Sequence, residues 1–415
     1  MRPASEVELR RLNDTFAELC AIPSPSGHER AVADRVAEEL RALGLEVEED
    51  DAGADTGGDC GNLLARLNGR AERSVLLCAH LDTVPHDGVI EPVLVDGAWE
   101  SAGETILGAD NKAAIVVLLA LAHRAAVEGM PVSVELLFTV GEENALAGAK
   151  SFDVTRLRSA LGYVFDHASP IGEIVVASPT YYRLEARFRG QAAHAGVRPE
   201  DGRSAVVAAA KAVSTMRLGR IDDETTANVG AIHGGARATN VVPEHCTLWA
   251  EARSLSEATA DELIAEMVDR CYDAANDPLC DCDVDMGVER MFRGYRHRPS
   301  APSVVAAEAA LRSCGYTPRR VQTGGGSDAN ALIASGLLCT NLANGTERNH
   351  EPTERVSQAA LHGMLEVAFA LLDELAGRGP GPAEPSVLSS PTVERGESAA
   401  ERGDLPTAMS ERGER

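Results

Sequence analysis

The sequence predicts an α/β protein that carries an inserted α+β domain. Through residue 180, apolar runs of strand length alternate with helical patterns, an order typical of an α/β layer structure. From 181 to 293 the pattern changes to short strands and two helices in the ferredoxin-like order β-α-β-β-α-β. The α/β pattern then returns. We therefore expect a main domain built from residues 1–180 and 294–376, with residues 181–293 as the insert.

The first part of the main domain should begin with two helices, near residues 5–20 and 28–43. Apolar side chains recur there at helical spacing, and Gly44 ends the second pattern. The run "SVLLCAHLD" at 74–82 is almost continuously apolar, which is typical of a strand covered on both faces. The other expected elements are strands in "LEVEED", "GNLLARLNG", "PVSVELLFTVGEE" and "LGYVFDHAS", and a buried helix in "AAIVVLLALAHRAAVEG".

The insert should begin with an antiparallel strand, because "YRLEARFRGQAAHAG" at 182–196 alternates with period two. A helix, two strands, a second helix and a last strand follow, at 202–219, 225–235, 244–255, 259–276 and 282–292.

The last part of the chain returns to the main domain and then changes in composition. We expect a helix at 300–315, a glycine-rich segment at 320–342, a polar loop at 343–354 and a final helix at 357–375. Residues 377–415 are rich in Pro, Gly, Ser, Glu and Arg and contain few core-forming side chains, so they are expected to form a disordered tail.

The composition fits a protein that handles small substrates. The net charge of −25 argues against a nucleic-acid or anionic-membrane partner, because both require a basic face. The nine cysteines are scattered and form no CxxC pair, as expected for free thiols in a reducing compartment. No apolar leader and no apolar run of about 18 residues is visible. We expect a cytoplasmic protein without a membrane partner.

Polar side chains gather where the predicted strands of the main domain end. Ligands of open α/β sheets bind outside the carboxyl ends of the strands. Taken singly, these residues have ordinary explanations, and Asp110, for example, could simply cap the following helix. Together they provide imidazoles and carboxylates without a thiolate, a set that suits Zn²⁺, Co²⁺ or Mn²⁺. The candidates are His80, Asp82, Asp110, Glu142, Glu143, Asp166 and His350.

Several separated motifs carry a family resemblance that spans about residues 10–375. The segments "AHLDTVP", "LGADNKAA", "TVGEENALAGAK" and "GYVFDH" resemble the aminoacylase/carboxypeptidase G superfamily of two-zinc hydrolases. Within it, "GGGSDAN", "TTANVGAIHGG", "ATNVVP" and "AEARSL" resemble the peptidase T-like branch. The resemblance implies a zinc-peptidase-like catalytic domain with a twisted, mostly parallel sheet. It also implies that the insert is a dimerisation, or lid, domain of a homodimer.

The resemblance implies two metal ions per chain, zinc being expected and cobalt or manganese the alternatives. One ion would be held by His80, Asp110 and Asp166, and the other by Asp110, Glu143 and His350. Asp110 would thus bridge the two, since a carboxylate offers one oxygen to each ion.

Two further acids would act beside the metals. Asp82 would hydrogen-bond His80 and fix its tautomer. Glu142 would be the general base, taking a proton from the metal-bridging water and passing it to the leaving amine. The alternative that Glu142 and Glu143 are both ligands stays open. The family often has an acid where this chain has Asn111, and the resemblance implies a cis peptide bond between Asp110 and Asn111.

The resemblance also implies substrate-binding residues outside the metal centre. In dimeric relatives the histidine that matches His194 reaches the active site of the partner subunit and stabilises the oxyanion, although a surface histidine is the simpler reading. Asn240 and Arg253 match positions that line the substrate cleft, while an ion pair with Glu251 is the ordinary alternative for Arg253. The glycine-rich loop would present backbone N–H groups to the substrate, and its candidate residues are Gly325 and Ser327.

The expected function is a two-metal peptidase that hydrolyses small peptides, as an aminopeptidase or tripeptidase. A dipeptidase, a carboxypeptidase or an N-acyl amino acid amidohydrolase could use the same metal centre. A non-catalytic homologue is disfavoured because every ligand position is filled. A nucleotide-binding protein is disfavoured because GxxxxGK[ST] and a GxGxxG after the first strand are both missing.

Overall fold

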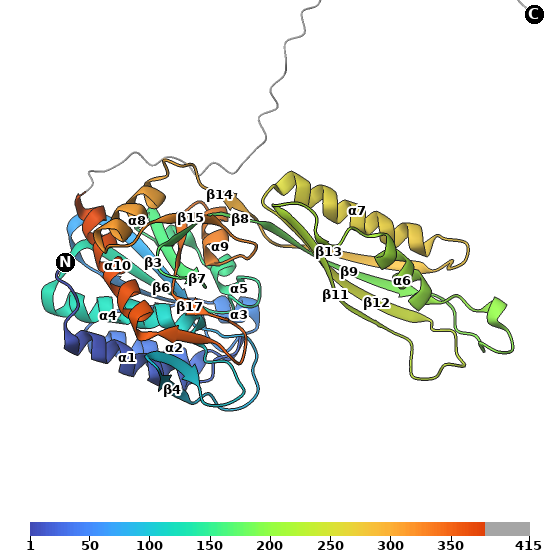
Figure 1. The fold of residues 1–415 in the computed structure, drawn as a ribbon, viewed down its shortest axis with the longest axis horizontal. Coiled ribbons are helices and arrows are strands. Elements are labelled where there is room, and N and C mark those ends of the chain that lie inside the picture. The colour runs from blue at the N-terminus through green and yellow to red at the C-terminus, as the bar shows by residue number, and fades with distance from the viewer. Residues whose placement is uncertain (378–415) are drawn as a thin grey trace, which may run out of the picture.

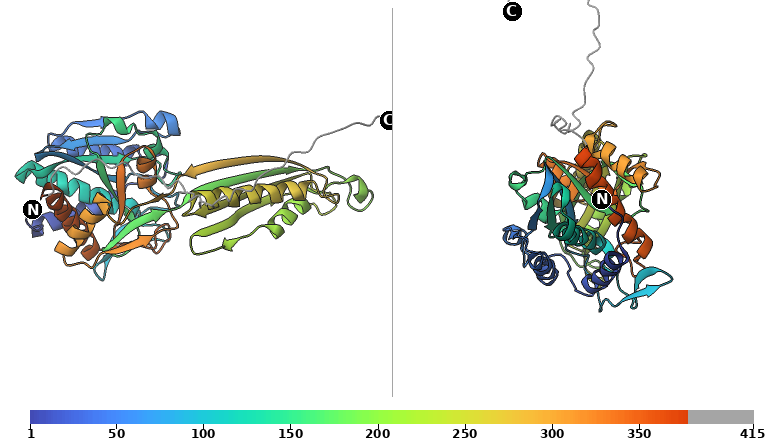
Figure 2. Two further views of the ribbon diagram at one scale, coloured as in Figure 1. Left: turned by 90° about the horizontal axis from the view of Figure 1, so that it is seen from above. Right: turned by 90° about the vertical axis from the view of Figure 1, so that its left-hand side faces the viewer.

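The computed structural model describes residues 1–377 and shows an elongated molecule with two parts. A rounded main domain carries both the first and the last described residues, and a slender second domain extends from one side of it (Figure 1, Figure 2). The predicted disordered tail of 377–415 lies outside the described residues, apart from Gly377.

The main domain is built on a nine-stranded sheet of order β1-β2-β6-β3-β7-β16-β8-β14, with β15 pairing to β8. Its central pairs β6-β3, β3-β7 and β7-β16 are parallel, and β1-β2, β2-β6, β16-β8 and β8-β14 are antiparallel. The predicted α/β class is confirmed, and the sheet is mixed where the prediction had it mostly parallel. The strands are β1 (Val47–Glu49), β2 (Leu63–Leu67), β3 (Gly69–His80), β6 (Met130–Thr139), β7 (Leu161–His167), β8 (Glu173–Ser178), β14 (Tyr295–Arg296), β15 (Arg319–Gln322) and β16 (Leu338–Ala343).

The central strand β3 separates two cores, which explains its continuous apolar run. Successive side chains of a strand point to opposite faces. Val75, Leu77 and Ala79 belong to the larger core, whereas Leu76 and Cys78 belong to the smaller one. The larger core is closed by α1 (Glu6–Cys20), α2 (Arg30–Ala42), α4 (Ala109–Glu128), α8 (Pro302–Ser313) and α10 (Gln358–Gly377), and the smaller one by α9 (Asp328–Ala334).

The second domain is an antiparallel sheet of order β10-β11-β12-β9-β13 with two helices on one face. In β12, buried side chains alternate with more exposed ones, as expected for a sheet with one covered face. The first strand ends at Arg189, and residues 190–203 form a loop instead of extending it to 196. The elements are β9 (Thr180–Arg189), α6 (Ala205–Thr215), β10 (Gly219–Arg220), β11 (Thr225–Gly234), β12 (His245–Ser254), α7 (Glu257–Ala275) and β13 (Asp283–Phe292).

A small sheet of order β17-β18-β5-β4, which the sequence did not predict, joins distant parts of the main domain. It pairs β4 (Pro92–Val95) and β5 (Ala98–Ser101) with β17 (Thr346–Glu347) and β18 (Arg355–Ser357). The loop between β17 and β18, which contains His350, is thereby held against the first third of the chain.

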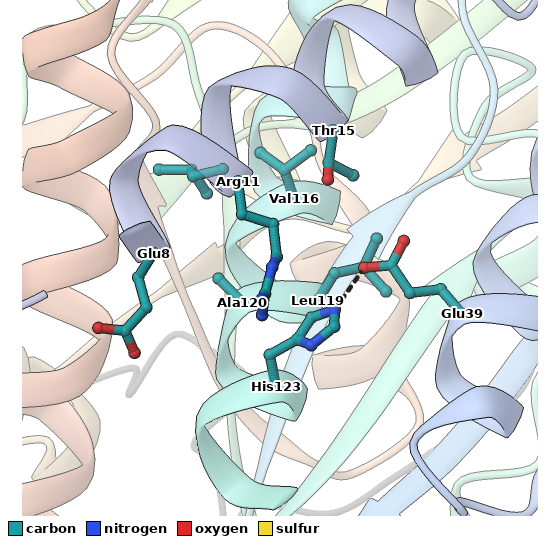
Figure 3. A pocket seen from close by; sticks show the side chains of 9 residues that line it. Glu8, Arg11, Thr15, Glu39, Val116, Leu119, Ala120 and His123 are labelled. Carbon is teal, nitrogen blue, oxygen red and sulfur yellow. Dashed lines mark hydrogen bonds and ion pairs between the residues drawn. The ribbon is translucent and has the colours of Figure 1, made fainter. Parts of the chain in front are cut away.

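A separate hollow lies between α1, α2 and α4, on a part of the main domain that carries none of the candidate residues (Figure 3). His123 and Glu39 interact across it at 2.8 Å. Its volume of about 10 Å³ is far below that of a ligand pocket. Among the described residues, no helix is long and apolar enough to cross a membrane, and all nine cysteines are free.

Candidate metal centre and substrate cavity

The candidate ligands come from neighbouring strand ends and from loops that the fold brings to them. His80 is the last residue of β3, and Asp166 is the second-to-last residue of β7. Glu142 and Glu143 follow β6, which is the parallel neighbour of β3 on its other side. Because the carboxyl ends of parallel strands meet at one edge of a sheet, these side chains share one site. Asp110 enters the site from the first turn of α4.

Asp110 lies between two groups of possible ligands. Its Oδ1 is 3.3 Å from Nε2 of His80, which is itself 3.6 Å from Oδ1 of Asp166. Its Oδ2 is 3.4 Å from Nε2 of His350, which is 2.7 Å from Oε1 of Glu143. In each group the three ligand atoms lie within 4.8 Å of one another. The two oxygens of Asp110 therefore face different groups, which is the arrangement a bridging carboxylate requires.

Asp82 contacts both the His80 ring and the loop that carries Glu142 and Glu143. Nδ1 of His80 lies 3.0 Å from the backbone carbonyl of Asp82 and 3.4 Å from its Oδ1. When the ring hydrogen is on Nδ1, it is donated to these oxygens of Asp82. Nε2 then carries no hydrogen and can bind a metal. The Asp82 carboxylate accepts the backbone N–H groups of Glu142 at 2.9 Å and Glu143 at 3.0 Å, and the hydroxyl of Ser26 at 2.6 Å. Asp82 thus holds the loop of the two glutamates as well as the His80 ring.

The electrostatics of the site show an excess of buried negative charge. Burial and the neighbouring Asp166 raise the pKa of Glu142 well above its usual value. Burial and the neighbouring Asp110 also raise the pKa of Asp166 well above its usual value. Hydrogen bonds to Asp110 and Glu143 raise the pKa of His350 to about 10. A buried anionic cluster of this kind is stabilised by cations, and its imidazole and carboxylate donors suit two borderline divalent ions.

Two residues close to His350 in the sequence hold Asp110 and the backbone before it in place. Neither was predicted from the sequence. Asn349 donates from Nδ2 to Oδ2 of Asp110 at 2.7 Å. Glu354, almost fully buried, accepts the backbone N–H groups of Leu107, Gly108 and Asp110 at 2.7–2.9 Å. The motif "NHEPTE" contains both, but only its histidine stood out as a ligand type. The peptide bond from Asp110 to the next residue is cis, so that prediction is confirmed.

A cavity of about 610 Å³ opens over the metal centre and is lined by both domains. From the second domain, Tyr181 and Arg253 line it. The Arg253 guanidinium lies 4.1 Å above the Tyr181 ring and binds both carboxylate oxygens of Glu251 at 3.1 Å. The ion pair considered as the ordinary alternative is therefore present, and Arg253 faces the cavity as well.

In the glycine-rich loop, the N–H groups of Gly325 and Ser327 both take part in local hydrogen bonds. Gly325 lines the cavity, but its backbone N–H is donated to the hydroxyl of Thr323 at 3.1 Å. Ser327 is buried at the start of α9, where it forms a capping box with Asn330, and it does not line the cavity. The N–H groups of Gly325 and Ser327 thus have local partners in this structure, and their contact with a substrate stays a prediction.

His194 and Asn240 lie outside the cavity of their own chain. Both are exposed, and they sit beside each other, since the N–H that follows His194 bonds to the Asn240 carbonyl at 2.9 Å. They belong to the end of the second domain that is far from the main domain, where β9 finishes and β12 begins (Figure 1). His167, which is not among the candidates predicted from the sequence, lines the cavity and interacts with Glu173 at 3.0 Å.

The comparisons with known proteins agree with this architecture. The model of the peptidase dimerisation domain of the M20 family matches residues 180–277, and that of peptidase family M28 matches 62–168. A protein of Bacillus subtilis described as uncharacterized protein YqjE is 36% identical over 372 residues, which cover 89% of this chain and all of that one. The aminopeptidase PepT of Bacillus cereus is 37% identical with a TM-score of 0.80, over 89% of this chain and 99% of its own. The chain belongs to the M20 peptidase family.

Further M20 structures share the fold. A tripeptidase of Staphylococcus aureus is 32% identical, with a TM-score of 0.84 over 89% of this chain and 99% of its own. A dinuclear metal-binding M20 peptidase of Bacillus subtilis superposes with a TM-score of 0.67 at 16% identity, which shows the fold alone. The M20 membership makes this protein a metallopeptidase, as the sequence predicted.

Proposed function

We propose that this M20 metallopeptidase hydrolyses small peptides with a free amino terminus, as an aminopeptidase or tripeptidase, using two zinc ions. The observation that carries the proposal is the position of Asp110 between two ligand groups, beside Glu142 and under the open cavity. The cavity volume of about 610 Å³ suits a ligand of a few residues. Relatives named as an aminopeptidase and a tripeptidase, both more than 30% identical, support this substrate class.

In the proposed mechanism, His80 and Asp166 would hold one ion, Glu143 and His350 would hold the other, and Asp110 would be a ligand to each. Bound there, the ions would supply Lewis acidity, which polarises the scissile carbonyl and lowers the pKa of a water molecule. Glu142 takes a proton from the attacking water and delivers it to the leaving amine as the C–N bond breaks.

The other residues position the loop and the substrate. Asp82 keeps the Glu142 carboxylate in place through the backbone N–H bonds described above. Arg253, fixed by Glu251 and Tyr181, binds a carboxylate or carbonyl oxygen of the peptide at the far side of the cavity.

His194 lies too far from its own cavity to take part there, so we infer that it serves the cavity of a second subunit in a homodimer formed through the second domain. The match to a peptidase dimerisation domain supports this. We infer a cytoplasmic location, where thiols stay reduced, and the nine free cysteines support it.

A substrate screen tests the proposal. The zinc-loaded protein should cleave tripeptides with free amino termini at the highest kcat/KM, with dipeptides and N-acyl amino acids below them. A chelator should abolish this activity, and added zinc should restore it. Cleavage of N-acyl amino acids with no cleavage of free-amino peptides would overturn the assignment in favour of an amidohydrolase.

A further inference from the structure

A second cluster of metal-binding side chains lies outside the catalytic centre and shares no residue with it. Glu29 precedes α2, and Asp59 and Cys60 follow the short helix α3 (Ala52–Thr56) in the loop that leads to β2. One ligand atom from each of these three residues lies within 4.8 Å of the other two. Bonds of about 2.0–2.3 Å to one central ion can span a cluster of this size after small side-chain adjustments.

One carboxylate oxygen in this cluster is buried without a partner. Glu29 is 1% exposed, and its Oε1 accepts the N–H groups of Gly27 at 2.9 Å and Gly141 at 3.0 Å. Its Oε2 has no hydrogen-bond partner among the described residues. This oxygen faces the loop of Asp59, because a Cβ placed on Gly58 would stand 3.8 Å from it. Leaving a buried carboxylate oxygen unpaired is costly, so its orientation points to a missing cation.

The guanidinium of Arg30, the residue after Glu29, binds acids outside the cluster. The guanidinium of Arg30 binds the carboxylate of Glu49 at 2.5–3.0 Å and that of Asp34 at 3.2 Å. Its contacts with Asp59 are to the backbone carbonyl. Burial and the neighbouring Glu29 raise the pKa of the Cys60 thiol. The cluster therefore combines a buried acid and a buried thiol with the Asp59 carboxylate. Arg30 bonds to this carboxylate only through its backbone N–H, at 2.9 Å to Oδ1, and its guanidinium pairs with none of the three side chains.

We propose that Glu29, Asp59 and Cys60 form a third divalent-cation site, of the zinc class, that is separate from the catalytic pair. Two carboxylates and one thiolate suit Zn²⁺ or Co²⁺, and a water molecule would complete the coordination. Binding releases the thiol proton to solvent, so the deprotonated sulfur becomes a ligand. The ion fixes Glu29, whose Oε1 holds the N–H of Gly141 directly before Glu142. The site thus anchors the catalytic loop from behind.

Cobalt substitution of the full-length protein tests this site with a readout that does not depend on activity. The catalytic ligands include no sulfur, so a thiolate-to-cobalt charge-transfer band can come only from a site that contains cysteine. The wild type should bind three Co²⁺ per chain and show this band. C60S should lose the band and one ion, whereas C314S, which alters a half-buried cysteine elsewhere, should keep both.

A second variant guards against a folding defect in C60S. Asp59 is exposed, and D59N should keep the fold while weakening the third ion by about tenfold or more. Two bound ions without a sulfur band in the wild type would overturn the proposal, and so would a band that persists in C60S. Neither result depends on which peptides the enzyme cleaves.

Discussion

The carboxylate of Asp82 accepts the backbone N–H of Glu142 at 2.9 Å, and its second oxygen accepts that of Glu143 at 3.0 Å. D82A would leave both buried N–H groups unpaired and release the loop that carries the base and one ligand. We expect kcat to fall about 10- to 100-fold and metal affinity to fall with it. Steady-state kinetics and metal titration of the purified variant measure the two effects.

Ser26 provides the matched control for this prediction. S26A removes only the hydroxyl that binds Asp82 at 2.6 Å and leaves both backbone contacts in place. Its effect on kcat should be much smaller. Equal losses in D82A and S26A would show that Asp82 does not act through the loop.

The adjacent acids Glu142 and Glu143 should separate catalysis from metal binding. E142Q removes the proton acceptor, so kcat should fall by about 10²–10⁴-fold while the metal content stays unchanged. E143Q removes a carboxylate that lies 2.7 Å from His350, and the protein should lose metal on dialysis. Elemental analysis beside kinetics distinguishes the two. Loss of metal in E142Q would mean that both acids are ligands.

The sequence predicted that these candidate ligands lie together because strand ends position them. His80, the two glutamates and Asp166 follow strands whose apolar runs are visible in one dimension, and parallel pairing brings their ends together. The supporting contacts of Asn349 and Glu354 were not predictable in this way. They depend on β17 pairing with β18 and on β18 pairing with β5, about 250 residues earlier, and these short strands leave almost no periodic signal.

The cavity side of the site was harder to predict for a different reason. Whether Arg253 or Asn240 faces the substrate depends on how the two domains sit against each other, and the local sequence around each residue does not show this. Arg253 is at the end of β12 next to the main domain, and Asn240 precedes its other end. Ser327 caps α9, and a serine before a helix is as often a cap as a binding residue, so its residue type alone does not distinguish the two roles.

Protonation of His297 should make the protein less stable in acid. Burial lowers its folded pKa to about 4, whereas the unfolded value is about 6.5. The unfolded chain therefore binds the proton first, so the free energy of unfolding falls as the pH drops below about 6.5 and levels off below 4. The loss is at most about 3 kcal/mol.

The variant H297Q should lack this part of the pH dependence. Denaturant titrations at several pH values between 7.5 and 4 should show the difference in unfolding free energy between wild type and variant shrinking as the pH falls. Groups of the metal centre titrate in both proteins and cancel in that difference. A constant difference across the range would contradict the assignment.

Arg253 should act mainly on substrate binding. R253K keeps the positive charge but loses the planar fork that binds Glu251 and stacks on Tyr181. We expect KM for a small peptide to rise about 10- to 100-fold with a smaller change in kcat. Arg183, which also lines the cavity but is 51% exposed and paired with Glu289, serves as the control. An equal rise of KM in R183K and R253K would show that Arg253 does not bind the substrate specifically.

His194 should act in the cavity of the partner subunit, because it is exposed at the far end of its own second domain. H194A and E142Q should each be nearly inactive as pure proteins. In a mixed dimer, the subunit that keeps Glu142 receives His194 from the E142Q subunit, so one of its two sites is complete. Random mixing should then restore about a quarter of the wild-type activity.

The control for this mixing experiment pairs E142Q with E143Q. Both defects lie in the same domain, so no mixed dimer contains a complete site, and activity should stay at the level of the single variants. Mass spectrometry of differently tagged subunits verifies that the mixed dimers have formed. If verified dimers of H194A and E142Q remain as inactive as this control, His194 does not serve the neighbouring cavity, and the oxyanion contact must come from within one chain.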